Sequence, residues 1–223
     1  MAVVGDALGA MLPFAAAIAV SPVPVLAALL MLMSAGGRTN ALALLAGWAA
    51  TLALVAGGVA LLGIGSGEDT GGSGVATAQL VLAAILMVII AVEWRGRPRR
   101  GAPHKPPRWM ALLTEFGATR ALGLGVALVV LNAKDGSLTV AAGAKLANAG
   151  PSLIGGALCV VLFVLVASAT VIVPVAVDVA LGERAQPILG RWHAWLQRHG
   201  STAAIATLAV VATVLAAQGL RDL

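Results

Sequence analysis

Long apolar stretches separated by short polar or glycine-rich segments recur along the whole chain. Each stretch is close to the ~20 apolar residues that a helix needs to cross the hydrocarbon layer of a membrane. The segments between them, such as the glycine-rich and acidic residues 65–74, encode no core of their own. The pattern therefore predicts an all-α integral membrane protein with about six transmembrane helices. The expected helices lie at approximately residues 7–34, 39–63, 75–94, 116–148, 152–181 and 202–219.

Two of the expected helices are interrupted near their middle. In the first, the sequence Ser-Pro-Val-Pro at residues 21–24 contains two prolines, and each proline removes a backbone donor and clashes with the preceding turn. The fourth stretch, 116–148, has 33 residues and would be about 50 Å long as one unbroken helix, more than a straight crossing needs. We expect its break at residues 132–136, where the sequence is Asn-Ala-Lys-Asp-Gly.

The two breaks occupy corresponding places in the two halves of the chain. Pro22 precedes Ala133 by 111 residues, which is about half of the 223-residue chain. With three crossings per half, the second half enters the membrane from the opposite side. The sequence thus predicts two inverted three-helix repeats, at residues 1–94 and 110–223, whose helices one and four are broken at mid-membrane. Paired breaks are typical of a transporter's central site, because unwound backbone in a membrane must line a cavity or be buried in protein.

The charges indicate how the chain lies in the membrane. Sixty per cent of the residues are hydrophobic and ten per cent are charged, so lipid must be the main solvent. Placing the basic linker, residues 95–109, in the cytoplasm brings eleven of the fourteen Lys and Arg residues to that side. We therefore expect a multi-pass protein of the inner (plasma) membrane with both termini extracytoplasmic. Topology and anionic lipid explain the basic residues, so we expect no nucleic-acid partner.

A segment near the carboxyl end has the pattern of a helix that lies in the membrane interface. It covers residues of about 186–199, and Pro187 starts it. Arg191 and Arg198 face away from its apolar side, as expected of an amphipathic interfacial helix. The apolar residues at helical spacing are Ile188, Leu189, Trp192, Trp195 and Leu196.

The residues at the two breaks resemble the proline-containing motifs of the lysine exporter superfamily. Within it, the chain is most similar to the actinobacterial peptidoglycolipid-addressing or sulfolipid-addressing proteins. The matching residues are 21–24, Gly47-Trp48, 131–135 and 141–143. One position departs from the family's usual Asn-Pro-Lys, because Ala133 stands in place of the proline. The resemblance implies transport of a glycolipid toward the cell surface, or of something needed with it.

Eight residues at or near the breaks and inside the apolar stretches are candidates for the transport path. Lys134 and Asp135 are charged and lie deep in an apolar stretch, which is costly without a partner. In a structural role, Asp135 caps a helix that starts near Ser137, and Lys134 neutralises it or binds carbonyl groups of the preceding half-helix. In a functional role, Lys134 attracts an anionic head group and Asp135 takes up a proton. The eight candidates are Ser21, Pro22, Pro24, Trp48, Asn132, Lys134, Asp135 and Asp178.

The other candidates also have two interpretations each. Ser21 and Asn132 either line the path or bind the backbone groups that the breaks leave without partners. Trp48 is too deep for an interfacial anchor, so it either stacks on substrate or packs between helices. Asp178 is an intramembrane acid of the path, or it reaches cytoplasmic water about one turn from the end of its helix.

The absence of catalytic motifs argues against an enzyme. The three histidines fall in segments that we expect in the cytoplasm, and the chain contains neither a His-Glu-x-x-His nor a Gly-x-Ser-x-Gly motif. We therefore expect no catalytic residue, no metal site and no cofactor.

We expect a secondary transporter or exporter of a glycolipid, a peptidoglycolipid or another amphipathic substrate. Two alternatives stay open: an exporter of small amino acids or cations, and a non-transporting membrane scaffold for lipid-synthesis enzymes. The expected partners are the lipid bilayer and a lipid or amphipathic small-molecule substrate. Gly5 and Gly9 form a small-xxx-small pair, which is weak evidence for a homodimer.

Overall fold

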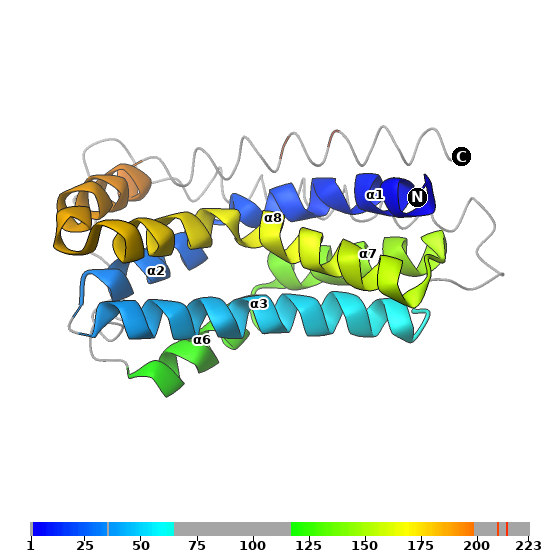
Figure 1. Ribbon diagram of the computed structural model, residues 1–223, viewed down its shortest axis with the longest axis horizontal. Helices are drawn as coiled ribbons and strands as arrows, with labels where there is room; N and C mark the ends of the chain where they lie inside the picture. Colours follow the sequence, from blue (N-terminus) through cyan, green and yellow to red (C-terminus); the bar gives the residue numbers. More distant parts are fainter. Residues whose placement is uncertain (1, 35, 65–116, 199–208, 210–212, 214–223) are drawn as a thin grey trace.

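The computed structural model describes residues 2–34, 36–64, 117–198, 209 and 213 (Figure 1). The helices expected at 75–94 and 202–219 and the linker at 95–109 lie outside these residues. The described residues are almost entirely helical, and none of them is in a β-strand. The long helices run roughly side by side along the long axis of the molecule.

The first expected helix is indeed broken. Helix α1 covers Ala2–Ala19 and helix α2 covers Pro22–Leu32, and the chain bends by 54° between them. Ser21 has extended backbone angles, φ −66° and ψ 116°, because the residue before a proline is kept out of the helical region. The expected break at 21–24 is too long, since Pro22 and Pro24 already belong to the first turn of α2. Proline is favoured at that end of a helix, where its missing N–H would have no helical acceptor.

The second break is sharper, although it contains no proline. Helix α6 covers Ala118–Val130 and helix α7 covers Ala133–Ala149, with a bend of 70° between them. Asn132 caps α7, because its side-chain Oδ1 accepts from the backbone N–H groups of Lys134 and Asp135 at 3.2 and 3.5 Å. The expectation that Asp135 caps a helix starting near Ser137 is therefore wrong: the cap lies three residues earlier.

Two helices are unbroken and are long and apolar enough to cross a membrane. Helix α3 covers Gly37–Leu61 and helix α8 covers Leu153–Leu181, close to the expected 39–63 and 152–181. If each bent pair counts as one span, the described residues contain up to four spans. This confirms an all-helical arrangement compatible with a membrane protein.

Helix α8 leads into a short structure at one end of the bundle. The 3-10 turn η1, Gly182–Ala185, is followed by a helix at 186–198, drawn in orange in Figure 1, which runs across the ends of the long helices. Ala185 and Leu189 are fully buried against α2, α3 and α8. The helix expected in the interface is thus present, and one side of it packs onto the bundle.

Glycine allows α3 and α6 to approach each other closely. A Cβ atom on Gly47 would overlap the backbone carbonyl of Leu122, and one on Gly125 would overlap that of Leu44. The next residue, Trp48, is fully buried in the core formed by α1, α3, α7 and α8. This contact explains why glycine is needed in the Gly-Trp pair.

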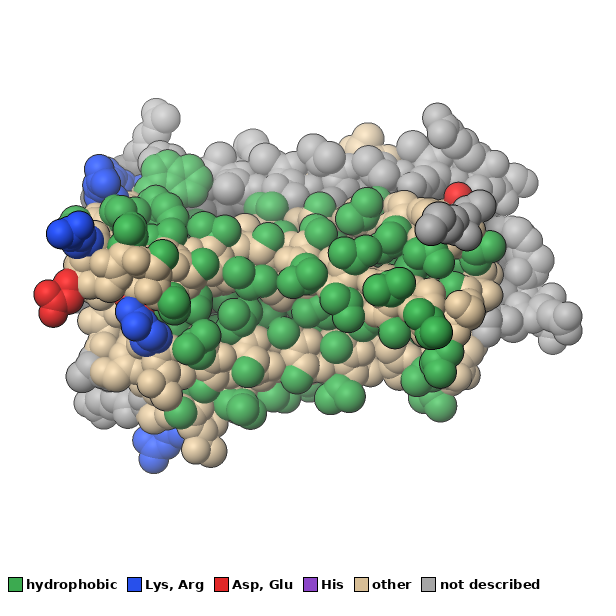
Figure 2. All heavy atoms as spheres, viewed as in Figure 1, with side chains coloured by type: hydrophobic (Ala, Val, Ile, Leu, Met, Phe, Trp, Pro, Cys, Tyr) green, Lys and Arg blue, Asp and Glu red, His purple; other side chains and the backbone are tan. Residues whose placement is uncertain are grey.

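The surface divides into an apolar middle and a basic end. Hydrophobic side chains cover the middle of the face seen in Figure 2, and Lys and Arg side chains gather at the end where α3 begins and the 186–198 helix lies. The exposed arginines of this basic end are Arg38, Arg120, Arg184, Arg191 and Arg198. Exposed leucines such as Leu54, 75% exposed, are suited to lipid rather than to water.

Candidate functional site

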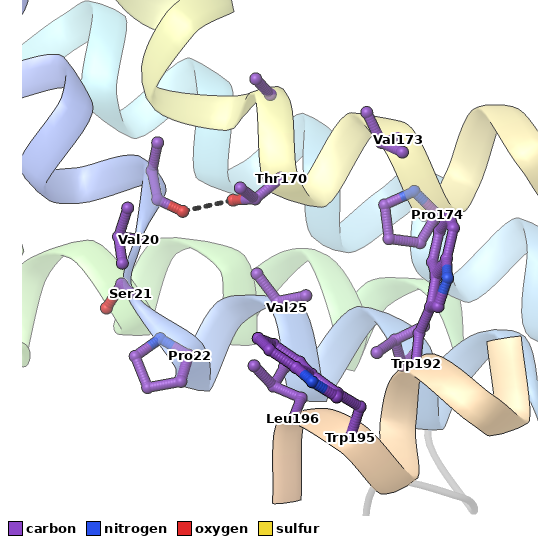
Figure 3. Close-up of a pocket in the computed structure, with 13 residues that line it drawn as sticks. Val20, Ser21, Pro22, Val25, Thr170, Val173, Pro174, Trp192, Trp195 and Leu196 are labelled. Carbon is purple, nitrogen blue, oxygen red and sulfur yellow. Dashed lines mark hydrogen bonds between the residues drawn. The ribbon is translucent and has the colours of Figure 1, made fainter. Parts of the chain in front are cut away.

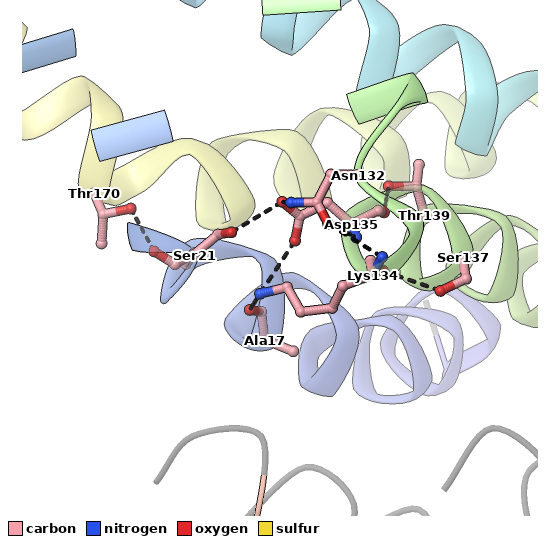
Figure 4. Close-up of polar contacts among 9 residues, drawn as sticks. Ala17, Ser21, Asn132, Lys134, Asp135, Ser137, Thr139 and Thr170 are labelled. Carbon is pink, nitrogen blue, oxygen red and sulfur yellow. Dashed lines mark hydrogen bonds and ion pairs between the residues drawn. The ribbon is translucent and has the colours of Figure 1, made fainter. Parts of the chain in front are cut away.

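The first break leaves two carbonyl groups of α1 without their helical partners. In an unbroken helix the Ala17 carbonyl would accept from the backbone N–H of residue 21, but Ser21 donates to Ile18 O instead, at 2.9 Å. The Ala17 carbonyl accepts from Lys134 Nζ at 3.2 Å, and the Ala19 carbonyl accepts from the Thr170 hydroxyl. Side chains from α7 and α8 therefore replace the hydrogen bonds that the break removes (Figure 4).

The second break supplies a buried carboxylate, and the Ser21 hydroxyl of the first break binds it. Asp135 is 0% exposed, and its Oδ2 accepts from Ser21 Oγ at 3.0 Å and from Asn132 Nδ2 at 2.7 Å. Its Oδ1 lies 3.2 Å from Lys134 Nζ. The two breaks therefore meet inside the bundle (Figure 4).

The positions of the two charges match the ends of the broken helices. Lys134 contacts the carboxyl end of α1, which carries partial negative charge, whereas Asp135 binds the residue that precedes the amino end of α2. The expected structural role is thus partly right, but Lys134 binds α1 rather than the preceding half-helix, α6. With a side chain only 11% exposed, Lys134 has its charge engaged within the protein.

A cavity of about 550 Å³ opens beside this polar network. It lies between the first break, the middle of α8 and the 186–198 helix, and the side chains of Trp192 and Trp195 form part of its wall (Figure 3). The cavity is in the size range of small-molecule sites. Its lining residues are Ala19, Val20, Ser21, Pro22, Val25, Leu29, Ala169, Thr170, Val173, Pro174, Trp192, Trp195 and Leu196.

The two hydroxyl groups in the described cavity wall are already engaged as hydrogen-bond donors. The Ser21 hydroxyl donates to Asp135 and the Thr170 hydroxyl donates to the Ala19 carbonyl. The wall contains no charged side chain from the described residues. The cavity can therefore accommodate an apolar chain but offers little to a charged or strongly polar molecule.

One interpretation of Asp178, that its side chain reaches water about one turn from the end of its helix, is wrong. Its side chain is 8% exposed, and its Oδ2 accepts from Arg38 Nε at 3.0 Å. Arg38 Nη2 also donates to the Asp178 carbonyl at 2.8 Å. This pair ties the start of α3 to the end of α8, outside both the cavity wall and the network at the breaks.

The structure brings together only some of the candidate residues. One cluster of hydrogen bonds and an ion pair contains Ser21, Asn132, Lys134 and Asp135. The cavity wall contains Ser21 and Pro22. Pro24 and Trp48 are buried and lie outside the cavity wall. The position of Trp48 fits the helix-packing interpretation rather than stacking on a substrate.

Sequence reasoning missed Thr170 and the part that two tryptophans play in the cavity. Thr170 is a hydroxyl residue in a long apolar helix, but only its contact with the Ala19 carbonyl makes it part of the break. Trp192 and Trp195 were expected at the interface, and their spacing did not reveal the cavity that they line.

A comparison with protein families identifies a relationship that covers both breaks and the cavity. A family model described as "Sap, sulfolipid-1-addressing protein" matches residues 11–221. No curated protein and no solved structure matches the chain.

Proposed function

The chain belongs to the sulfolipid-1-addressing protein (Sap) family, and on that premise we propose that it is a secondary membrane transporter. It moves a glycolipid, a peptidoglycolipid or a similar amphipathic substrate toward the cell surface without changing it chemically. Family membership supports the role in lipid addressing. The transport step and the substrate's path are our own proposals.

The observation that carries the proposal is the shared position of Ser21. This residue directly precedes α2 at the first break, binds Asp135 of the second break and lines the apolar cavity. A substrate that enters the cavity therefore lies against the point where the two broken helices meet. A movement of either break would change the cavity wall, which is the coupling that a transporter needs.

The chemistry of the cavity favours a lipid over a small polar substrate. An amino acid or a cation would need charged or carbonyl partners to replace its hydration. The described wall offers apolar side chains, two engaged hydroxyls and the indole rings. A substrate with an acyl chain is the better match.

We also propose how the chain lies in the membrane. The basic end faces the cytoplasm, because the positive-inside rule places arginine there, and both termini are extracytoplasmic. Six helices form two inverted repeats in the inner membrane, with the meeting breaks near its middle. The bend of 54° in one span and 70° in the other supports this arrangement of paired broken helices.

Filling the cavity tests the proposal. In the native host, Val25→Phe should reduce the fraction of the substrate lipid found at the cell surface by about tenfold or more, because the added ring occupies the cavity. Mass spectrometry of surface-extracted and total lipids measures that fraction. Val140→Phe is the matched control, since Val140 is 42% exposed on α7 and lies outside the cavity wall.

Two results would contradict the proposal. Unchanged surface lipid with Val25→Phe at normal protein levels would mean that the cavity is not on the substrate's path. A fall in total lipid with an unchanged surface fraction would favour the scaffold for lipid-synthesis enzymes instead.

A further inference from the structure

The described wall of the cavity next to Ser21 contains no charged side chain that could bind the head group of a lipid. The Ser21 and Thr170 hydroxyls both donate hydrogen bonds to oxygen atoms of the protein. The nearby charges of Lys134 and Asp135 neutralise each other. Asp135 is fully buried. A lipid that places a chain in this cavity must therefore keep its head group elsewhere.

The 186–198 helix provides a place for the head group. Trp192, Trp195 and Leu196 of this helix line the cavity. Arg191 lies four residues before Trp195, and Arg198 lies three residues after it. Residues three or four apart are neighbours on the surface of a helix, so both arginines, on the polar side of this helix, lie next to Trp195 at the boundary with its apolar side.

These two arginines are available to an anion. Both are exposed, and neither forms an ion pair with a carboxylate of the described residues. Arg198 Nε donates to the Ala194 carbonyl, a bond within its own helix. Guanidinium groups recognise phosphate and sulfate well, because their planar N–H groups match two oxygen atoms at once.

We propose that the cavity takes an acyl chain of an anionic lipid from the bilayer, while Arg191 and Arg198 bind its phosphate or sulfate head group outside the cavity. The indole rings of Trp192 and Trp195 separate the two parts, as expected of aromatic residues at a membrane interface. This inference rests on the proposed function, because it assigns the binding mode of the same cavity.

Quenching of tryptophan fluorescence by brominated lipids tests the binding mode. The full-length protein is reconstituted in vesicles that contain either phosphatidylglycerol or phosphatidylcholine with brominated acyl chains. Trp192→Phe/Trp195→Phe identifies the part of the quenching that comes from the cavity. We expect the anionic lipid to quench that part at a lower mole fraction than the zwitterionic lipid.

The charge-removing variant Arg191→Gln/Arg198→Gln should abolish the preference for the anionic lipid but keep quenching by both lipids. Each arginine should contribute about fivefold to the ratio of the mole fractions at which the two lipids quench. This factor corresponds to ~1 kcal/mol for one basic residue near an anionic membrane surface. Arg120→Gln/Arg184→Gln is the matched control, because it removes the same charge from the same end of the molecule. It should keep the preference.

Each other outcome overturns part of the inference. Equal quenching by the two lipids in the unaltered protein would exclude the head-group site, and an equal loss in the control variant would attribute the preference to the overall charge. The absence of quenching from Trp192 and Trp195 would exclude an acyl chain in the cavity. If the substrate lipid reaches the cell surface normally but quenching shows no preference for the anionic lipid, this inference alone is contradicted. If quenching is selective for the anionic lipid but no substrate lipid is transported, the proposed function alone is contradicted.

Discussion

At the scale of single residues, the buried pair of Lys134 and Asp135 does most to join the two breaks. Each charge has its counter-ion and a further partner on the first break. A buried ion pair adds little net stability over an apolar pair, but removing one partner leaves the other charge buried and unpaired. The free energy of unfolding should therefore fall more when one of the two charges is removed than when both are removed.

Asp135→Asn should lower the free energy of unfolding by about 3–5 kcal/mol, because the Lys134 ammonium would stay buried without its carboxylate. The double variant Lys134→Met/Asp135→Asn should recover most of that loss. Thermal unfolding in detergent, followed by the export assay at matched protein levels, measures both properties. A double variant as unstable as Asp135→Asn would contradict the ion-pair explanation, and a stable double variant without export would show that the pair also acts in transport.

A second residue-scale prediction concerns the glycines of α3. Gly47→Ala should destabilise the protein by about 1–3 kcal/mol, because the new Cβ would overlap the backbone of Leu122 and force α6 away. Gly58→Ala on the same helix is the control, since nothing lies within 4 Å of its Cβ position. It should be neutral or stabilising, by up to about 1 kcal/mol. Equal effects on the thermal midpoint would rule out a close crossing at Gly47.

At the scale of elements, each break is also the start of a helix. Helix α2 starts with prolines after an extended Ser21, and α7 starts after an extended Asn132, with φ −85° and ψ 99°. Asn132 therefore already has the backbone conformation that a following proline requires. Ala133 occupies the first helical position, where proline is favoured.

Ala133→Pro should leave the fold intact and raise the free energy of unfolding by about 0.4–1 kcal/mol. The gain comes from reducing the freedom of the unfolded chain. Val140→Pro in the interior of α7 is the contrasting variant and should cost ~3 kcal/mol or more. A marked destabilisation by Ala133→Pro would mean that α7 does not begin at residue 133.

At the scale of the whole molecule, the distribution of charge predicts the orientation. The basic end contains Glu183, which is exposed in η1, and the opposite end contains Asn148, which is exposed at the end of α7. In a Cys159→Ala background, Asn148→Cys should react in intact cells with a thiol reagent that cannot cross membranes. Glu183→Cys should react only after the membrane is permeabilised. The reverse pattern would invert the proposed topology.

Several features of this fold could be predicted because their causes are local. The prolines at 22 and 24 and the cap at Asn132 set the breaks to within a few residues, since backbone sterics and side-chain capping act over one turn of chain. The lengths of α3 and α8 follow from continuous apolar stretches that match the thickness of a membrane. The amphipathic spacing of 186–198 likewise predicted a helix at that place.

Only the tertiary structure decided which of these residues meet. Ser21 and Asp135 are 114 positions apart, and Arg38 and Asp178 are 140 apart. A sequence pattern describes the face of one helix but not the helix that will cover it, so neither pairing could be derived from spacing. The cavity is likewise a product of packing, because its wall comes from the first break, α8 and the 186–198 helix, and its volume depends on how closely these three approach.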